Sequence, residues 1–483
     1  MDLNGGAVAT ESPLLGTKVA VERWWKWNKL LDVEEAKDQI SLSLPLIVAN
    51  ASYYFITLVS VMFAGHLGEL ELAAANLANS WATATGFAFM VGLSGALETL
   101  CGQGYGAKLY EMLGIYLQTS CMLSSFFAVL VSILWWYSEF IFTLLHQDPQ
   151  ISKAASLYLK YLIPGLFAYG FLQNILRFLQ MQSVVSPLVM CSLFMLIIHV
   201  GITYALFHWT SFGIKGAALA ASISLWILVL ILGVYVLHAK KCAHTWNGLS
   251  LESFRFIFAN LKLALPSAAM MCLEEWAFEL LVLLAGMMPN SKTNTSLIAM
   301  CANTESICYM LACGLGATTS TRVSNELGAG NPDRARRAMT NALKMAILIA
   351  LVVILALTFG HNLWASCFSY SPEILQAFSS MTPLLLVSIS CDFFQAILSG
   401  VTRGCGWQHF GVCINLATFY LIGMPIAVLL GFKMKLYAQG LWIGLICGLS
   451  LQTLGLLWLT KISKWTRIEL TQNCSNKILE ENA

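Results

Sequence analysis

Apolar segments long enough to cross a lipid bilayer recur along the whole chain, and they limit its possible folds more than any other feature. A helix needs about 20 apolar residues to cross a hydrocarbon core of about 30 Å. Twelve such segments are predicted, at 40–64, 74–98, 113–137, 155–180, 185–207, 214–238, 259–285, 296–320, 338–360, 375–402, 410–431 and 437–460. They must be helical, because backbone polar groups in lipid have to be satisfied within their own segment. We therefore predict an all-α membrane protein with twelve transmembrane helices.

The composition agrees with lipid as the solvent and excludes several functions. Of the 483 residues, 58% are hydrophobic and 11% are charged, whereas soluble proteins carry about 25% charged residues. A net charge of +2 gives no basic surface for nucleic acid. The scattered cysteines have no zinc-site spacing, and no nucleophile–base pair stands out on facing helices. We expect neither an enzyme nor a cofactor.

Lysine and arginine residues are distributed unevenly over the predicted loops. An even number of spans places both termini on one side, and most of the 27 Lys and Arg residues fall there. The positive-inside rule then puts both termini in the cytoplasm. The predicted domains are a cytoplasmic tail (1–39), a first lobe (40–238), a cytoplasmic linker (239–258), a second lobe (259–460) and a cytoplasmic tail (461–483). Trp and Lys residues in 19–39 suggest an interfacial helix, with a flexible tail as the alternative.

The two halves of the chain repeat each other at an offset of 222 residues. The segment FLQNIL at 171–176 matches FFQAIL at 393–398. Single residues match at the same offset, namely Gly92 with Gly314, Thr99 with Thr321 and Gly106 with Gly328. Each half has an even number of spans, so the halves run in the same sense and are related by a pseudo-two-fold axis along the membrane normal. Repeated halves with a solute site between them are a recurrent plan of transporters.

Pro45 and Pro266 lie one residue off that register, each early in the first helix of its half. A proline inside a helix removes one backbone hydrogen bond and permits a bend. We interpret both as hinges for alternating access, with a static kink as the alternative.

Acidic residues inside the predicted spans are the best candidates for chemistry, because a charge at the bilayer centre costs about 2.5–3.5 kcal/mol. Glu98 is close to a helix end, where we expect it to reach water, and we discount it. The others belong to the second half. We expect the seventh, eighth and tenth spans to enclose a cavity that gathers these acids and nearby amides: Glu274 or Glu279, Glu305, Asn303, Asp392 and Gln395.

Such a cavity would favour proton exchange. A carboxyl group in a low-dielectric cavity can take up and release a proton near neutral pH, and its negative form suits a cationic substrate. Glu275 and Glu279 share one face of their helix, and Glu274 points to another side. The alternative is that these acids are neutral, hydrogen-bonded packing groups.

Three segments resemble the multidrug and toxic compound extrusion family in its plant form. They are STRVSNELGAGNP at 320–332, CLEEWAFEL at 272–280 and VTRGCGW at 401–407. The resemblance covers about residues 30–464 and implies two six-helix lobes arranged as a V around a central cleft. It also implies proton-coupled antiport of organic solutes out of the cytosol.

The same resemblance implies roles for single residues. The family's seventh-helix glutamate falls on Glu274, a later glutamate of that motif on Glu279, and the tenth-helix aspartate on Asp392. Two positions depart from the pattern. Ser60 stands where bacterial relatives have an aspartate, which implies that the first half lacks that cation site. Glu275 stands where plant members usually have an aromatic residue.

The leading interpretation is an exporter of organic solutes driven by the proton gradient, working as a monomer in the plasma or vacuolar membrane. Its partners are protons, a small organic substrate and the lipid bilayer. We expect proton coupling at Glu274, Asp392 and Glu279. We expect substrate contacts at Glu275, Asn303, Glu305 and Gln395. The alternative is a flippase of lipid-linked precursors, which would favour a cationic central cavity, whereas the acids predict an acidic one.

Overall fold

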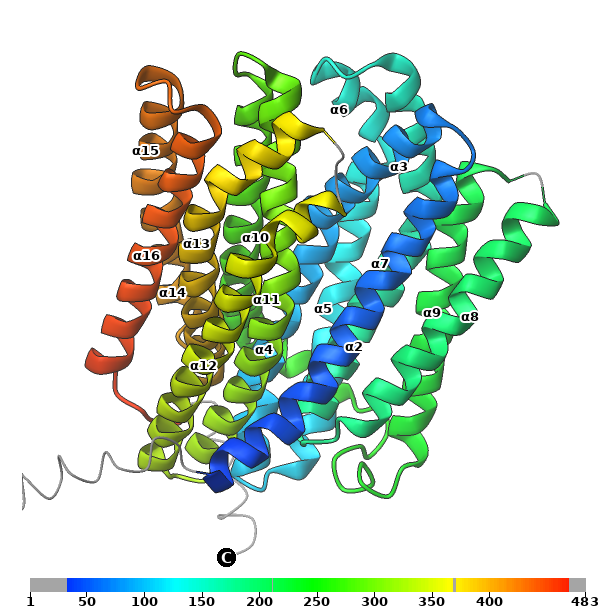
Figure 1. Ribbon diagram of the computed structural model, residues 1–483. Coiled ribbons are helices and arrows are strands. Elements are labelled where there is room, and N and C mark those ends of the chain that lie inside the picture. The colour runs from blue at the N-terminus through cyan, green and yellow to red at the C-terminus, as the bar shows by residue number, and fades with distance from the viewer. Residues whose placement is uncertain (1–32, 211, 368–370, 469–483) are drawn as a thin grey trace, which may run out of the picture.

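Long helices make up the computed structural model, which describes residues 33–210, 212–367 and 371–468 (Figure 1). No strand occurs in these residues. Twelve of the helical segments in the described part of the chain are long and apolar enough to cross a membrane. Each predicted span falls inside one of these helices, with an overhang of at most one residue, and most helices run past the predicted ends. The all-α prediction and the number of spans are confirmed.

The first half of the chain forms six spans. Its elements are α2 (Val33–Gly65), α3 (Glu69–Ala82), the π-helical η2 (Thr83–Phe87), α4 (Ala88–Gly106), α5 (Tyr110–Trp136), the short α6 (Ser138–Leu144), α7 (Pro149–Met181), α8 (Ser186–His208) and α9 (Ile214–His238). Elements α3, η2 and α4 follow one another without a break and together form the second span. Most of the predicted interfacial helix at 19–39 lies outside the described residues, and from Val33 onward the chain already belongs to α2.

The second half forms the other six spans. After a short 3-10 turn, η3 (Leu251–Phe256), come α10 (Ile257–Gly286), α11 (Ser291–Gly328), α12 (Pro332–Ser366), α13 (Pro372–Cys405), α14 (Gln408–Asn415), η4 (Leu416–Gly423), α15 (Met424–Val428), η5 (Leu429–Lys433) and α16 (Tyr437–Ile462). The eleventh span is α14 to η5, and two π-helical stretches interrupt it. Such π turns are frequent at functional sites, and the hydrophobic pattern does not predict them.

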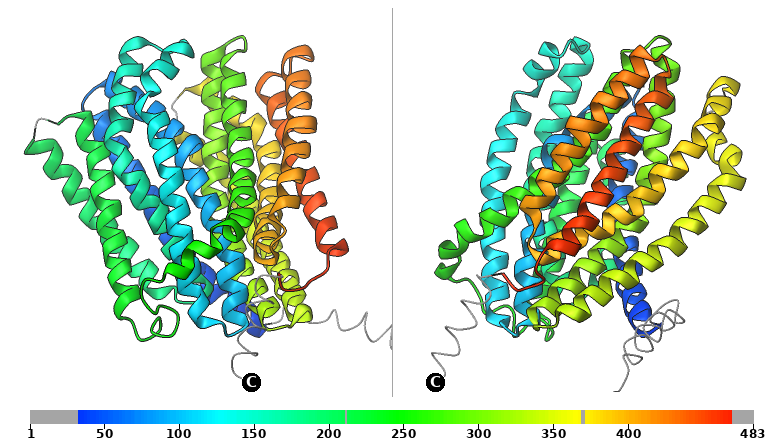
Figure 2. Two further views of the ribbon diagram at one scale, coloured as in Figure 1. Left: turned by 180° about the vertical axis from the view of Figure 1, so that it is seen from behind. Right: turned by 90° about the vertical axis from the view of Figure 1, so that its left-hand side faces the viewer.

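The two halves are two lobes that lie side by side. In Figure 1 the first six spans, blue to green, occupy one side and the last six, green to red, the other, and Figure 2 shows the same division from behind. The lobes meet mainly where α4 packs against α10 and α11. Both ends of the described chain lie at the bottom of Figure 1. We call this the terminal side, and the opposite end the far side.

Residues related by the 222-residue repeat touch each other in the middle of the bundle. The Ser320 hydroxyl on α11 donates to Glu98 on α4 at 2.6 Å, and these two residues are 222 apart. Gly102 and Ser324 are separated by the same interval, and a Cβ atom on Gly102 would overlap Ser324. Two repeat-related residues can touch only where the symmetry axis passes between them. The predicted pseudo-two-fold axis therefore runs between α4 and α11.

Pro45 and Pro266 lie inside α2 and α10, and both helices continue through them. Pro164 in α7 and Pro383 in α13 are likewise inside spanning helices. Pro425 in α15 lies inside the eleventh span, so the described spans contain five internal prolines. The hinge role of Pro45 and Pro266 stays a prediction.

Candidate functional site

A group of buried polar side chains surrounds Glu274 in the second lobe. Glu274 on α10 is 9% exposed. The Gln395 amide on α13 donates to its Oε2 at 2.6 Å, and the Gln452 amide on α16 approaches the same oxygen at 3.4 Å. Gln452 also donates to Asn415 on α14 at 2.9 Å. Glu274 is thereby tied to three further helices of its own lobe.

Two more acids lie close to this group. Asp392 on α13 is 4% exposed and is within electrostatic range of both Glu274 and Glu305. Glu305 on α11 is 2% exposed, and neither of its carboxyl oxygens has a hydrogen-bond partner among the described residues. The Ser388 hydroxyl lies close to Glu305, but it donates to the Leu385 carbonyl at 3.0 Å. We call Glu274, Glu305, Asp392, Gln395 and Gln452 the acid cluster.

The acid cluster has more acceptors than donors. Besides Glu305, the Oε1 atoms of Gln395 and Gln452 are buried without a partner among the described residues. A buried acceptor without a donor costs about 1–3 kcal/mol, and an uncompensated charge costs more. The cluster is therefore stable when protons, water or a cation supply the missing donors or positive charge.

The structure does not gather every residue that the sequence assigned to this cavity. Asn303 is exposed on the surface of α11. Glu279 is half-buried and interacts with Glu275, one turn away on the same face of α10, as the spacing predicted. The predicted role of Glu279 in proton coupling stays a prediction. Gln452 and Asn415 were missed, because an amide in an apolar span gives no sign of which helix it faces.

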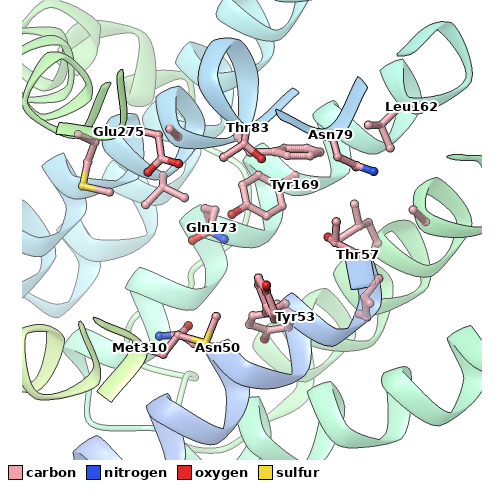
Figure 3. Close-up of a pocket in the computed structure, with 18 of the residues that line it drawn as sticks. Asn50, Tyr53, Thr57, Asn79, Thr83, Leu162, Tyr169, Gln173, Glu275 and Met310 are labelled. Atoms are coloured by element: carbon pink, nitrogen blue, oxygen red, sulfur yellow. The ribbon is translucent and has the colours of Figure 1, made fainter. Parts of the chain in front are cut away.

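A separate cavity of about 330 Å³ lies mostly within the first lobe, and we call it the central cavity. Its walls come from α2, α3, η2, α4, α7 and α9, closed by α10 and α11 of the second lobe. Figure 3 shows Tyr169 and Gln173 between Glu275 of α10 and Tyr53 of α2. The lining also contains Tyr54, Tyr158 and Tyr309, and the amides of Asn50 and Asn79.

The central cavity is not the acidic one that was predicted. Among its described lining residues, Glu275 and Arg177 are the only charged ones. Glu274, Glu305 and Asp392 belong to the acid cluster instead, and none of them lies in the cavity wall. Adjacent residues on a helix point about 100° apart. This offset lets α10 present Glu274 to the acid cluster and Glu275 to the central cavity.

Ser60 takes part in a hydrogen-bonded group within the first lobe. It is fully buried and lies 3.1 Å from Nε2 of His199, whose Nδ1 is 2.8 Å from the Ser224 hydroxyl. Both ring nitrogens of His199 therefore have partners. A neutral hydroxyl–imidazole group occupies the position for which the resemblance implied an aspartate in bacterial relatives.

The prediction that Glu98 reaches water is wrong. Glu98 is fully buried, with Nε of Arg403 3.1 Å from its Oε2 and Nε of Arg177 3.3 Å from its Oε1. The helix continues beyond Glu98 to Gly106, and α11 and α13 of the second lobe cover the carboxylate, as its contacts with Ser320 and Arg403 show. Whether a helix end meets water depends on its neighbours, which the sequence of one span does not define.

Comparisons with known proteins agree with this architecture. The MatE family model matches residues 45–205 and 266–429, one segment in each lobe. Protein DETOXIFICATION 18 of Arabidopsis thaliana is 59% identical over 441 residues, which cover 91% of this chain and 94% of that protein. Protein DETOXIFICATION 17 of the same plant is 44% identical over 434 residues, covering 90% and 91%.

Solved structures share the fold. The crystal structure of the eukaryotic MATE transporter AtDTX14 has a TM-score of 0.88 and 38% sequence identity, and the match covers 92% of this chain and 99% of that one. An outward-facing multidrug resistance MATE family transporter matches with a TM-score of 0.78 at 19% identity, over 88% and 95% of the two chains. The second match supports the two-lobe fold alone.

Proposed function

The chain belongs to the MATE family of membrane transporters, in its plant branch, and from this premise we propose that it exports organic solutes in exchange for protons bound in the second lobe. Efflux by antiport follows from the family. The driving ion, the proton sites and the solute class are our proposals.

The observation that carries the proton sites is the excess of buried acceptors in the acid cluster. A proton on Glu274, Asp392 or Glu305 supplies a missing donor and removes a buried charge. Losing that proton leaves an anion that needs new partners. The contacts of Glu274 with Gln395 and Gln452 should therefore rearrange with each proton bound.

We propose that α10 connects proton binding to the solute. Glu274 and Glu275 are adjacent on it, so a movement of α10 at the acid cluster also moves Glu275 in the wall of the central cavity. Pro266 lies two turns before Glu274 and leaves a backbone carbonyl without its helical donor. It is the proposed hinge in the second lobe, as Pro45 is in the first.

The central cavity suits a small aromatic solute that carries positive charge. Its volume of about 330 Å³ lies at the lower end of the range for sites that bind drug-sized ligands. Tyrosine rings attract cations through their faces, and Glu275 adds a carboxylate. Arg177 is the single cationic side chain among the described residues of the cavity wall, which offers little support for a flippase of anionic lipid-linked precursors.

The closed terminal side indicates which state the structure represents. Inter-lobe contacts there include Gln103 with the Gly404 carbonyl at 3.1 Å and Asn325 with the Met181 carbonyl at 3.1 Å. Exposed Asn303 lies two turns beyond Met310 of the cavity wall, toward the far side. With both termini in the cytoplasm, as the positive-inside rule predicts, we propose that the closed terminal side faces the cytoplasm and that the structure represents an outward-facing state in the plasma or vacuolar membrane.

Transport by sealed vesicles tests the proposal. We would load vesicles with ethidium, a fluorescent aromatic cation, and follow its exchange under an imposed pH gradient or sodium gradient. We expect pH-driven exchange in the parent and its loss in Glu274→Gln and Asp392→Asn, whereas Glu111→Gln, which removes an exposed carboxylate, behaves like the parent. Undiminished pH-driven exchange in both variants, or exchange driven by sodium alone, would contradict the proton sites.

A further inference from the structure

We propose that Glu98 is a latch that holds the two lobes together on the terminal side of the central cavity. In this proposal Arg403 binds Glu98 when that side is closed, and Arg177 alone keeps it paired when that side opens. The inference rests on the antiport activity of the family and does not depend on which ion drives transport.

Glu98, Arg177 and Arg403 form a triad of charged side chains that crosses from one lobe to the other. Glu98 on α4 and Arg177 on α7 belong to the first lobe, and Arg403 on α13 belongs to the second. Oε2 of Glu98 accepts hydrogen bonds from Arg403 Nε at 3.1 Å and from the Ser320 hydroxyl at 2.6 Å, both on the second lobe. Oε1 faces Arg177 of its own lobe at 3.3 Å without a hydrogen bond.

The triad lies between the cavity and the terminal side. Arg177 forms part of the cavity wall, and beyond it the Gln180 amide bonds the Ala317 carbonyl of the second lobe at 2.9 Å. On α4, the contact of Gln103 with Gly404 follows Glu98 toward the terminal side. A solute in the central cavity can therefore reach the terminal side only after the contact between Glu98 and Arg403 has parted.

The two arginines, Arg403 and Arg177, should affect the open and closed states differently. When the lobes separate, Arg403 and Ser320 leave with the second lobe, and Arg177 stays beside Glu98. Stranding a buried charge is strongly destabilising, and Arg177 prevents it in the open state. Arg403 should therefore stabilise the closed state, whereas Arg177 should lower the cost of opening.

This asymmetry gives the two arginines opposite predicted effects. Glu98→Gln and Arg403→Gln each remove the attraction across the lobes, so the open state should become more populated. Arg177→Gln leaves the contact across the lobes intact and deprives the open state of its compensating charge, so the open state should become rarer. A group that merely supports packing would give a change of the same sign in all three variants.

Hydrogen–deuterium exchange of the full-length protein in lipid nanodiscs, without solute, measures these populations. The readout is the exchange rate of segments 99–107 and 321–329, which meet on the terminal side. We expect it to rise about tenfold or more in Glu98→Gln and Arg403→Gln, to fall in Arg177→Gln, and to stay at the parental rate in Glu111→Gln.

Two results would overturn the latch. One is a faster exchange in Arg177→Gln as well, which would make the triad a packing group. The other is parental exchange in Glu98→Gln and Arg403→Gln, which would mean that other contacts keep the lobes closed. Neither result decides whether the acid cluster binds protons, because the exchange rate reports the contact between the lobes and not the protonation of carboxyl groups.

Discussion

Replacing Gly328 by alanine should selectively weaken the closed state of the terminal side. Gly328 ends α11 of the second lobe, and a Cβ atom there would overlap the Gln103 carbonyl oxygen and lie 2.8 Å from its carbonyl carbon and Cα. Gln103 belongs to α4 of the first lobe. Gly106, the repeat counterpart of Gly328, meets the Asn325 backbone in the same way. All these obstacles are backbone atoms, so the two helices would have to move apart.

The size of the effect follows from the geometry. Overpacking of this kind costs about 1–3 kcal/mol, and the clash exists only while the lobes touch. The cost therefore falls on the closed state, and the ratio of open to closed molecules should rise about 5- to 150-fold. Gly400→Ala provides a contrast, since its Cβ would strike the Gly316 backbone inside the second lobe and should destabilise both states.

Hydrogen–deuterium exchange on the terminal side, together with thermal melting of the purified protein, separates these effects. Gly328→Ala should speed exchange with little change in melting, and Gly400→Ala should mainly lower the melting temperature. Gly360→Ala is the control, because nothing lies within 4 Å of its added Cβ. Parental exchange in Gly328→Ala would refute the backbone contact between the lobes.

Three further predictions concern other parts of the molecule. Gln452→Leu removes donors from Glu274 and Asn415 and should lower pH-driven ethidium exchange with little change in melting, whereas an unchanged rate would mean that Gln452 has no part in coupling. Arg322→Gln breaks the partly exposed inter-lobe pair with Glu35 at 2.5 Å. Its loss should cost the closed state at most about 1 kcal/mol, less than the loss of the buried contact of Glu98. Terminal-side exchange as fast as in Glu98→Gln would contradict this expectation. Burial raises the pKa of the Cys242 thiol, and Lys241 partly offsets this effect. Less thiolate is therefore present near neutral pH, and maleimide should label Cys242 slowly until the protein is unfolded. Cys242→Ser identifies the label that belongs to this thiol.

The spans and the repeat could be predicted because neither depends on knowing how the helices pack. An apolar run has the length of the bilayer whatever packs against it, and glycine, threonine and glutamine matches at a fixed offset reveal the duplication. Repeat-related Glu98 and Ser320 even touch in the structure. The sequence does not reveal that contact, because no pattern within a span says which of its faces lies on the symmetry axis.

The acid cluster was predicted in part. Glu274, Glu305, Asp392 and Gln395 were expected to come together because an acid deep in a span needs partners, and they do lie near one another. Exposed Asn303 and half-buried Glu279 do not join them. The central cavity was not foreseen, because its tyrosines and amides come from α2, α3, α7 and α11 and none of them stands out in its own span.

Infrared difference spectroscopy of carboxyl groups tests the central claim, that the acid cluster binds the coupling proton, most directly. Spectra of the protein in nanodiscs would be recorded in mildly acidic and mildly alkaline buffer, without solute. We predict an absorption of protonated, buried carboxyl groups that disappears as the pH rises and that is lost or strongly reduced in a Glu274→Gln/Asp392→Asn double variant. Glu98→Gln should retain it, because Glu98 is already paired with two arginines. An undiminished absorption in the double variant would contradict the account.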